Sequence, residues 1–462
     1  MRPWMKASML ALFVFAATWA GAVWYWRATN RMPSTTDLLA YMVALPLSVL
    51  LALWVGRRLA ALPAASAAAT AAPQAQAAAA APARLPSLAV LASSIRTPHG
   101  ASAPALDEAL AEGRARADLD PELLDDEGYP LMTLRADDAL DAALRKDIED
   151  WLLLTGLPDP AWSAAQWRAL VLGSAVASEL ALHAAAHPDA LAGPEDPQAP
   201  LLHLHAFATA DWTVEQCATA AAWLSETVVQ AGWPEDKVRA VVMPPLGVAP
   251  GATLLTELAA QAEHGAEPVL ALVLAFGSHI GADSVDEMAR AGQLFAAGRP
   301  QGRIPGEGAA GLLLADAWQA RLFAEPAPLL QVAFAPHQGG AAGKPDAALL
   351  RRLTDELLPG SGDAAMVTAV YADTGHRTAP IMELMALSGA LLPHLDPGLD
   401  VRRLGAACGA CGDAPFLAAL ALAHQHALET GAAALCVANE AEQQRSAALV
   451  RPAAPPDLSG QT

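Results

Sequence analysis

The stretch over residues 282–316, ADSVDEMARAGQLFAAGRPQGRIPGEGAAGLLLAD, decides the fold. Its first part, 283–294, has apolar residues at helical spacing, and an irregular loop follows. The sequence PGEG at 305–308 predicts a tight turn, because proline and glycine favour turn conformations. Small and then large apolar residues at 309–315 predict a buried strand. The stretch therefore predicts a helix, a loop, a turn and a strand in that order.

Outward from this stretch, short apolar runs alternate with amphipathic segments. Continuous apolar strands between helices indicate an α/β protein with buried sheets. An acidic segment at 119–128 is predicted to be a solvated helix. The predicted strands are 87–93, 167–177, 201–208, 239–243, 269–276, 328–334, 365–371 and 432–437. The predicted helices are 137–154, 212–231, 251–264, 346–358, 380–392 and 414–429.

Composition excludes some classes of function. The chain has 462 residues and a formal net charge of −20. Nucleic-acid binding requires a basic surface, so a nucleic-acid partner is not expected. The four cysteines, Cys217, Cys408, Cys411 and Cys436, make no disulfide framework and suit a reducing compartment.

The amino-terminal region predicts a membrane anchor over residues 1–58. Residues 7–26 and 38–55 are apolar and close to the ~20 residues that cross a bilayer. More basic residues lie at the outer ends of the two spans than in the loop that connects them. This difference predicts that both ends face the cytoplasm. An Ala/Pro-rich linker over 59–85 follows. These features predict a two-pass protein of a bacterial inner membrane with most of its mass in the cytoplasm.

The stretch that decides the fold resembles a segment of the β-ketoacyl synthases, members of the thiolase superfamily. In that family the pattern is roughly G-x-D-S, a helix, G-R-L, and then F-I-P-G-E-A-A-A with an apolar strand. Two further segments carry the resemblance: 404–423, similar to the family's late glycine-rich turn, and 371–377 at the tip of a strand. The matching residues include Gly281, directly before the stretch 282–316, and within it Asp283, Ser284, Pro305, Gly306, Glu307 and Gly308.

The resemblance implies a five-layer αβαβα sandwich of two similar halves. It covers 86–451, with halves at about 86–320 and 321–451. Family members pair through a strand at the edge of the sheet, so it also implies a homodimer. Residues 452–462 are expected to be a disordered tail.

The resemblance also implies where condensing chemistry would need its residues. That chemistry uses a cysteine at a helix start, where the dipole favours the thiolate, and two histidines or a His and an Asn. The nucleophile position falls near 251–254, where Thr253 is the nearest hydroxyl. Gly405 or Ala406 fills the late histidine position. Asp373 is nearest to the other expected histidine, with His376 three residues on. The active site is therefore expected to be degenerate.

Other polar residues have both functional and structural interpretations. Cys408 and Cys411 form a C-G-A-C sequence, whose spacing suits a redox or metal pair or two small residues in a tight turn. His279 follows a predicted strand on the side where α/β folds bind ligands. His376 with Asp373 is a candidate acid/base pair.

Two histidines and one glutamate complete the candidates. His203 and His205 alternate on a predicted strand and share a face, which suits either a metal site or a polar face. Glu307 is interpreted as structural. No metal and no cofactor are predicted.

Three functions remain open from the sequence. The first is a membrane-anchored binding or assembly scaffold, with an accessory of an envelope machine such as type VI secretion as the analogy. The second is a condensing enzyme or acyltransferase acting on acyl thioesters. The third is a protein that binds acyl groups without chemistry. The missing cysteine favours the first.

Overall fold

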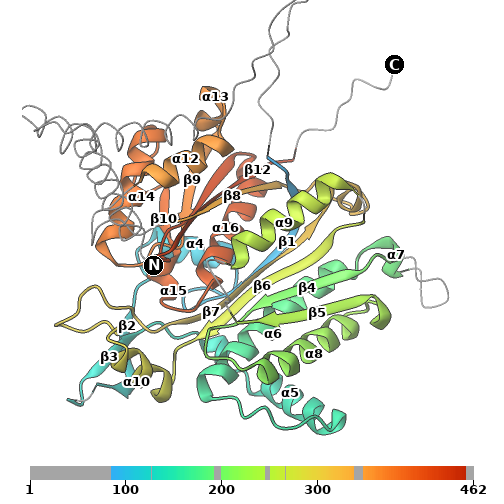
Figure 1. The fold of residues 1–462 in the computed structure, drawn as a ribbon, viewed down its shortest axis with the longest axis vertical. Coiled ribbons are helices and arrows are strands. Elements are labelled where there is room, and N and C mark those ends of the chain that lie inside the picture. The colour runs from blue at the N-terminus through green and yellow to red at the C-terminus, as the bar shows by residue number, and fades with distance from the viewer. Residues whose placement is uncertain are drawn as a thin grey trace, which may run out of the picture. The chain divides into compact units, whose positions relative to one another are not determined.

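A computed structural model of the protein describes residues 85–453, except 126, 192–198, 245–249, 266 and 338–346. The chain forms a mixed α/β fold around one ten-stranded sheet and a separate two-stranded hairpin (Figure 1). The strands of the large sheet are β1 (Leu88–Arg96), β4 (Leu202–Phe207), β5 (Val238–Met243), β6 (Leu270–Ser278), β7 (Glu307–Ala315), β8 (Leu329–Pro336), β9 (Val367–Ala372), β10 (Val401–Arg403), β11 (Ala433–Ala438) and β12 (Gln444–Arg451). The hairpin pairs β2 (Asp118–Leu124) with β3 (Pro130–Thr133).

Helices connect and cover these strands. The longer ones are α4 (Ala103–Ala111), α5 (Ala142–Thr155), α6 (Ala164–Ala184), α8 (Val214–Gln230), α9 (Pro250–His264), α10 (Ala282–Arg290), α12 (Ala348–Leu357), α14 (Thr378–Leu391) and α16 (Ala414–Thr430). The short ones are η2 (Asp137–Leu140), α7 (Pro188–Leu191), η3 (Glu235–Lys237), α11 (Ala317–Ala320), α13 (Ser361–Ala365) and α15 (Leu404–Cys408).

The strand order repeats between the two halves of the sheet. From one edge the order is β5-β4-β6-β7-β1, and from the other edge it is β10-β9-β11-β12-β8. β7 in the first half and β12 in the second run antiparallel to both of their neighbours, while β5, β4 and β6 are parallel to one another, as are β10, β9 and β11. β1 and β8 join the halves through a short antiparallel contact at Leu88–Leu330 and Ala89–Leu329. Each half therefore has the same topology.

Helices lie outside and between the two halves of the sheet. α6 packs on β1, β6 and β7, and α8 packs on β5. α16 contacts β6 and β7 of the first half and β9 and β11 of the second, while α9 contacts β1 and β8. On the far side of the second half, α12 covers β8 and β12 and contacts α14. α16 is buried along most of its length, as expected for a helix between the two halves of the sheet.

Most predicted elements are found with boundaries shifted by a few residues. The stretch at 282–316 contains α10, a loop and the buried strand β7, as the pattern predicts. The turn prediction at 305–308 was wrong in its second half, because Glu307 and Gly308 already pair with Ser278 and Gly277 of β6. Thr213 caps α8 through a capping box with Gln216.

Two predictions of element type were wrong. The strand predicted at 167–177 is the middle of α6, whose residues there are buried on nearly every side. A helix buried all round has the same continuous apolar run as a buried strand, so periodicity cannot separate them. The segment predicted as a helix at 119–128 contains strand β2 and the start of the following turn. Asp120 is buried in this strand, where its carboxylate accepts hydrogen bonds from Arg135 and Thr133.

Across the part of the chain that the structure describes, no helix is long and apolar enough to cross a membrane. The spans predicted at 7–26 and 38–55 lie outside the described residues, as do nearly all of the predicted linker and tail. The anchor, the linker and the tail therefore stay predictions.

Candidate functional site

The amino-terminal ends of two central helices meet where the halves join. The side chain of Asp413, directly before α16, accepts a hydrogen bond from the backbone N–H of Gly251 at the start of α9, with Oδ2 at 3.1 Å. The positive ends of two helix dipoles therefore face one carboxylate. Burial raises the pKa of Asp413, and the hydrogen bond from Gly251 opposes that rise. Thr253 lies half-buried in the first turn of α9.

Asp373 lies at the end of β9, next to this junction. Its Oδ1 accepts hydrogen bonds from the backbone N–H groups of Asn439, at 2.7 Å, and Glu440, at 3.1 Å. Burial raises the pKa of Asp373 to about 7; those hydrogen bonds oppose the rise, and the negative charges of Glu440 and Asp413 add to it. The carboxyl therefore titrates near neutral pH in the folded chain.

The turn between β11 and β12 is bonded tightly to the turn after β9. Thr374 donates to the Asn439 side chain at 2.5 Å, and the Gly375 N–H donates to Glu440 at 2.9 Å. Arg377 Nε bonds Glu440 at 2.7 Å. The polar groups of these two turns thus satisfy one another.

The contacts of His279 and His376 differ from those of an acid/base pair. His279 Nδ1 lies 2.8 Å from the carbonyl oxygen of Ala410, so Nδ1 carries the donated proton, and burial lowers the pKa of this histidine. The His376 ring packs edge-on against Phe295, and its buried Nε2 has no hydrogen-bond partner. Asp373 bonds instead to the backbone at 439 and 440.

All four cysteines are buried and free. Burial raises the pKa of Cys217 to about 11 and that of Cys408 to about 12, and it also raises the pKa values of Cys411 and Cys436. The Cys411 thiol points at the carbonyl oxygen of Cys408, with sulfur and oxygen 3.7 Å apart. These thiols stay protonated at neutral pH and are poor nucleophiles.

The contacts of the Glu307 side chain are those of a structural residue. It is completely buried, and its carboxylate accepts hydrogen bonds from Arg168 of α6, the Ala136 N–H at 2.7 Å and the Ser278 hydroxyl at 2.9 Å. Beside it, Gly306 lies so close to the Cys408 carbonyl that a Cβ would be 2.0 Å from that oxygen. The 305–308 segment therefore joins the first half of the fold to the loop before α16.

Three other residues of the 282–316 stretch that match the family pattern are Asp283, Ser284 and Pro305. Asp283 is exposed and Ser284 half-buried in the first turn of α10. The carbonyl oxygen of Pro305 accepts from the Leu134 N–H at 3.0 Å.

The two histidines on β4 lie side by side. The rings of His203 and His205 stack with centroids 5.9 Å apart. The pKa of His205 is lowered to about 4, mainly by burial and to a smaller extent by the charge of the neighbouring His203. Among the described residues, no group of three or more His, Cys, Asp or Glu side chains is placed to hold a metal ion.

Sequence reasoning missed Asp413, Asn439 and Glu440 as neighbours of Asp373. A signal for Asp413 was present, because an acidic residue stands alone before the otherwise apolar start of α16. The turn at 439–440 had none, because strand β12, which places it, was not predicted.

We expect Asp373 to make stability depend on pH. Between about pH 4, the usual pKa of an aspartate, and about 7, the unfolded chain has released this proton while the folded chain retains it. The folded state therefore becomes less stable relative to the unfolded state as pH rises through this interval. Asp373→Asn should lack that decline. Urea unfolding from pH 4 to 8 tests this, with the exposed Asp355→Asn on α12 as the control, and parallel curves for wild type and Asp373→Asn would contradict it.

Solved structures with a similar fold are ketosynthase domains. The chain aligns with the ketosynthase of module 6 of the bacillaene synthase from Bacillus subtilis 168 at a TM-score of 0.56 and 15% identity, covering 80% of this chain and 72% of that one. An oxazolomycin ketosynthase domain from Streptomyces albus gives a TM-score of 0.55 and 15% identity over 80% and 75%. The ishigamide ketosynthase/chain length factor gives 0.52 and 16% over 80% and 100%.

These similarities define the class of fold, a mixed α/β fold of the thiolase-like ketosynthase type. No protein-family model matches the sequence, and no curated protein matches it. At such low identity the likeness concerns the fold, and the function rests on the site itself.

Proposed function

We propose that this chain is a thiolase-like protein that has lost the condensing reaction and acts by binding other proteins at the membrane. The observation that carries the proposal is the state of the reactive groups at the junction of the halves. An aspartate engaged by two backbone N–H groups, Asp373, lies where a histidine is expected. No cysteine lies between residues 218 and 407 of the sequence, so none is available at the start of α9.

The missing nucleophile weighs against acyl-thioester chemistry. A condensing enzyme needs a thiolate that can attack a thioester at neutral pH. Here the four thiols are buried with raised pKa values. Thr253, the hydroxyl nearest to the expected position, would need a base to activate it, and a neutral hydroxyl is a weak nucleophile.

The membrane setting follows from the predicted anchor at 1–58. A two-span hairpin with both ends in the cytoplasm would hold the thiolase-like domain, through the linker at 59–85, near the inner face of a bacterial inner membrane. We take an accessory of an envelope machine such as type VI secretion as the analogy for this architecture. We propose that role by analogy.

A homodimer is part of the same proposal. Among the strands of the described residues, β5 is the last at one edge of the large sheet and pairs on one side only, with β4. Arg239 is exposed and Val241 is 45% exposed on this strand. A second β5 could pair there and extend the sheet across two copies, which sedimentation of the full-length chain would detect as twice the chain mass.

We expect no acyl transfer from this protein. The full-length chain is incubated with radiolabelled malonyl and fatty acyl thioesters, and a ketosynthase with an intact cysteine is the positive control. Neither turnover nor covalent label should appear, because the four thiols are buried and their pKa values are raised. Covalent label that survives replacement of all four cysteines by serine or alanine would contradict the proposal. Reversible binding without label would favour the acyl-binding function.

Binding partners are tested separately. Crosslinking in intact membranes followed by purification of the chain should recover specific proteins with the wild type. Failure to recover any protein would count against the scaffold role, whatever the result with thioesters.

A further inference from the structure

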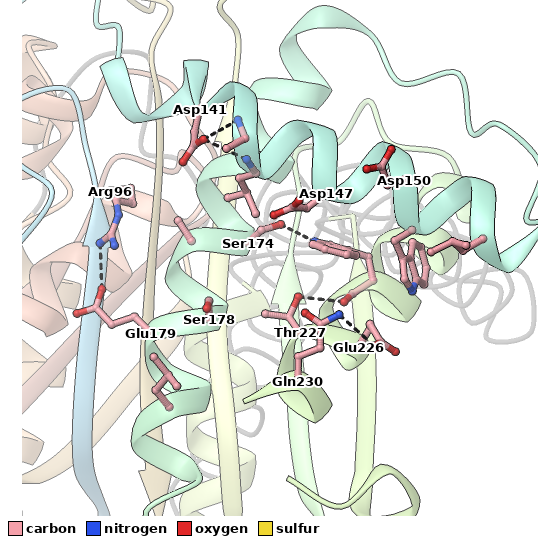
Figure 2. A pocket seen from close by; sticks show the side chains of 17 residues that line it. Arg96, Asp141, Asp147, Asp150, Ser174, Ser178, Glu179, Glu226, Thr227 and Gln230 are labelled. Atoms are coloured by element: carbon pink, nitrogen blue, oxygen red, sulfur yellow. Dashed lines mark hydrogen bonds and ion pairs between the residues drawn. The ribbon is translucent and has the colours of Figure 1, made fainter. Parts of the chain in front are cut away.

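An open groove of about 930 Å³ lies on the outer face of the first half of the fold. The residues that line it are different from those where the two halves join. Figure 2 shows α5 along one side, with α6 and α8 below it. The groove belongs to neither the Asp373 site nor the β5 edge, because its lining comes chiefly from the three outer helices. It has an apolar floor and an acidic rim.

The apolar part combines a rigid floor with exposed edges. Trp223 is buried, donates to Ser174 at 2.8 Å and meets Trp151 edge-to-face at 5.5 Å between ring centroids. Leu154 of α5 and Leu182 of α6 line the groove and are 87% and 62% exposed. Large apolar side chains that are exposed together beside a groove are typical of an interaction surface.

The charged part is strongly one-sided. The lining includes five carboxylates, Asp141, Asp147, Asp150, Glu179 and Glu226, and one basic side chain, Arg96. Arg96 is already bonded to Glu179 at 3.1 Å, and Lys146 outside the groove pairs with Asp150.

Two of these carboxylates keep their charge available. Among the described residues, Asp147 and Glu226 have no ion pair with a basic side chain; Glu226 accepts only an amide hydrogen bond from Gln230. In Figure 2, Asp147 projects from α5 toward the middle of the groove and Glu226 lies on α8 across it. A ligand between them would meet negative charge from two sides.

From this combination we infer that the groove binds a basic amphipathic helix of a partner protein. Its apolar face would lie on Trp151, Leu154 and Leu182, and its lysines or arginines would reach Asp147 and Glu226. A second copy of the same groove is a poor occupant, because it would bring like charges together in a chain of net charge −20. The inference rests on the proposed binding role and gives it a surface and a partner chemistry.

A designed peptide tests this inference without knowledge of the partner. The probe is a fluorescent leucine–lysine peptide of about 14 residues with its leucines on one helical face. Its binding to the full-length chain in phosphatidylcholine nanodiscs is followed by fluorescence anisotropy, with empty nanodiscs subtracted. Two control peptides have the same composition in shuffled order, or glutamate in place of lysine. Binding should weaken with added salt, because charge attraction contributes to it.

Matched variants locate the binding site. Asp147→Lys and Glu226→Lys should each weaken binding of the probe at least about tenfold. Asp355→Lys changes the net charge equally at an exposed position of α12, and it should change binding less than about twofold. Leu154→Asn, at an exposed position, should also weaken binding without affecting folding.

Four results would overturn the inference. The first is equal weakening by Asp147→Lys and Asp355→Lys, and the second is equal binding of the ordered and shuffled peptides. The third is a change of oligomeric state in the groove variants, which would assign the groove to a second copy. The fourth is partner recovery that is unchanged in Asp147→Lys, which would leave the scaffold role standing and reject only this surface. Loss of all partners with an intact peptide site would do the reverse.

Discussion

Glu307→Ala should lower the free energy of unfolding by about 3–5 kcal/mol, one of the largest effects expected from a single substitution in this chain. The carboxylate is fully buried, and the Arg168 side chain that pairs with it is only 11% exposed. Removal of the carboxylate leaves a guanidinium buried without its partner, together with the N–H of Ala136 and the hydroxyl of Ser278. Urea unfolding followed by tryptophan fluorescence measures the loss.

An exposed ion pair provides the matched control. Glu287 and Arg290 on α10 also form a glutamate–arginine pair, but both side chains are about two-thirds exposed. Glu287→Ala should cost less than about 0.5 kcal/mol, because water replaces the lost partner. The double variant Arg168→Ala/Glu307→Ala should cost less than the sum of its single variants, since neither charge is then left unpaired. Equal losses for Glu287→Ala and Glu307→Ala would refute this account of the 305–308 segment.

Much of the fold could be predicted from local patterns. The buried strand β7 and the capped helix α8 follow from apolar runs and from a capping box that lies within four residues. The type of α6 could not be predicted, because a helix buried all round has no polar face. β12 escaped prediction because its alternation is hidden: Gln444, Arg445 and Ser446 are all buried.

The candidate site was harder to predict than the fold. Asp373 could be chosen because it lies at the tip of a predicted strand. Its partners could not, since they come from 439 and 440 and depend on how β11 and β12 turn. Likewise, Asp413 meets Gly251 from 162 residues away. Contacts between distant segments depend on tertiary packing, which no local pattern encodes.

Gly405→Ala should be nearly as damaging as the loss of Glu307, at about 3 kcal/mol or more. A Cβ at residue 405 would lie 1.9 Å from the carbonyl oxygen of Asp373 and 2.8 Å from the nitrogen of Gly375. The Gly375 N–H is bonded to Glu440, and residue 373 is held by its backbone N–H to the Val437 carbonyl and by its side chain to the Asn439 N–H, so the turn cannot move away without straining these bonds. The methyl group should therefore displace the turn after β9, and urea unfolding should show the loss.

A second glycine substitution tests whether Gly405→Ala acts through close packing, because the two substitutions should change stability in opposite directions. Gly389 lies on an exposed part of α14, and a Cβ there meets no atom within 4 Å. Gly389→Ala should stabilise the chain by about 0.5–1 kcal/mol, because alanine loses less backbone entropy in a helix. If Gly405→Ala acts by moving Asp373, it should also weaken the decline of stability between pH 4 and 7 that Asp373 causes. A destabilised Gly405→Ala with an unchanged pH profile would mean that the strain is relieved elsewhere, at α15 instead of the Asp373 turn.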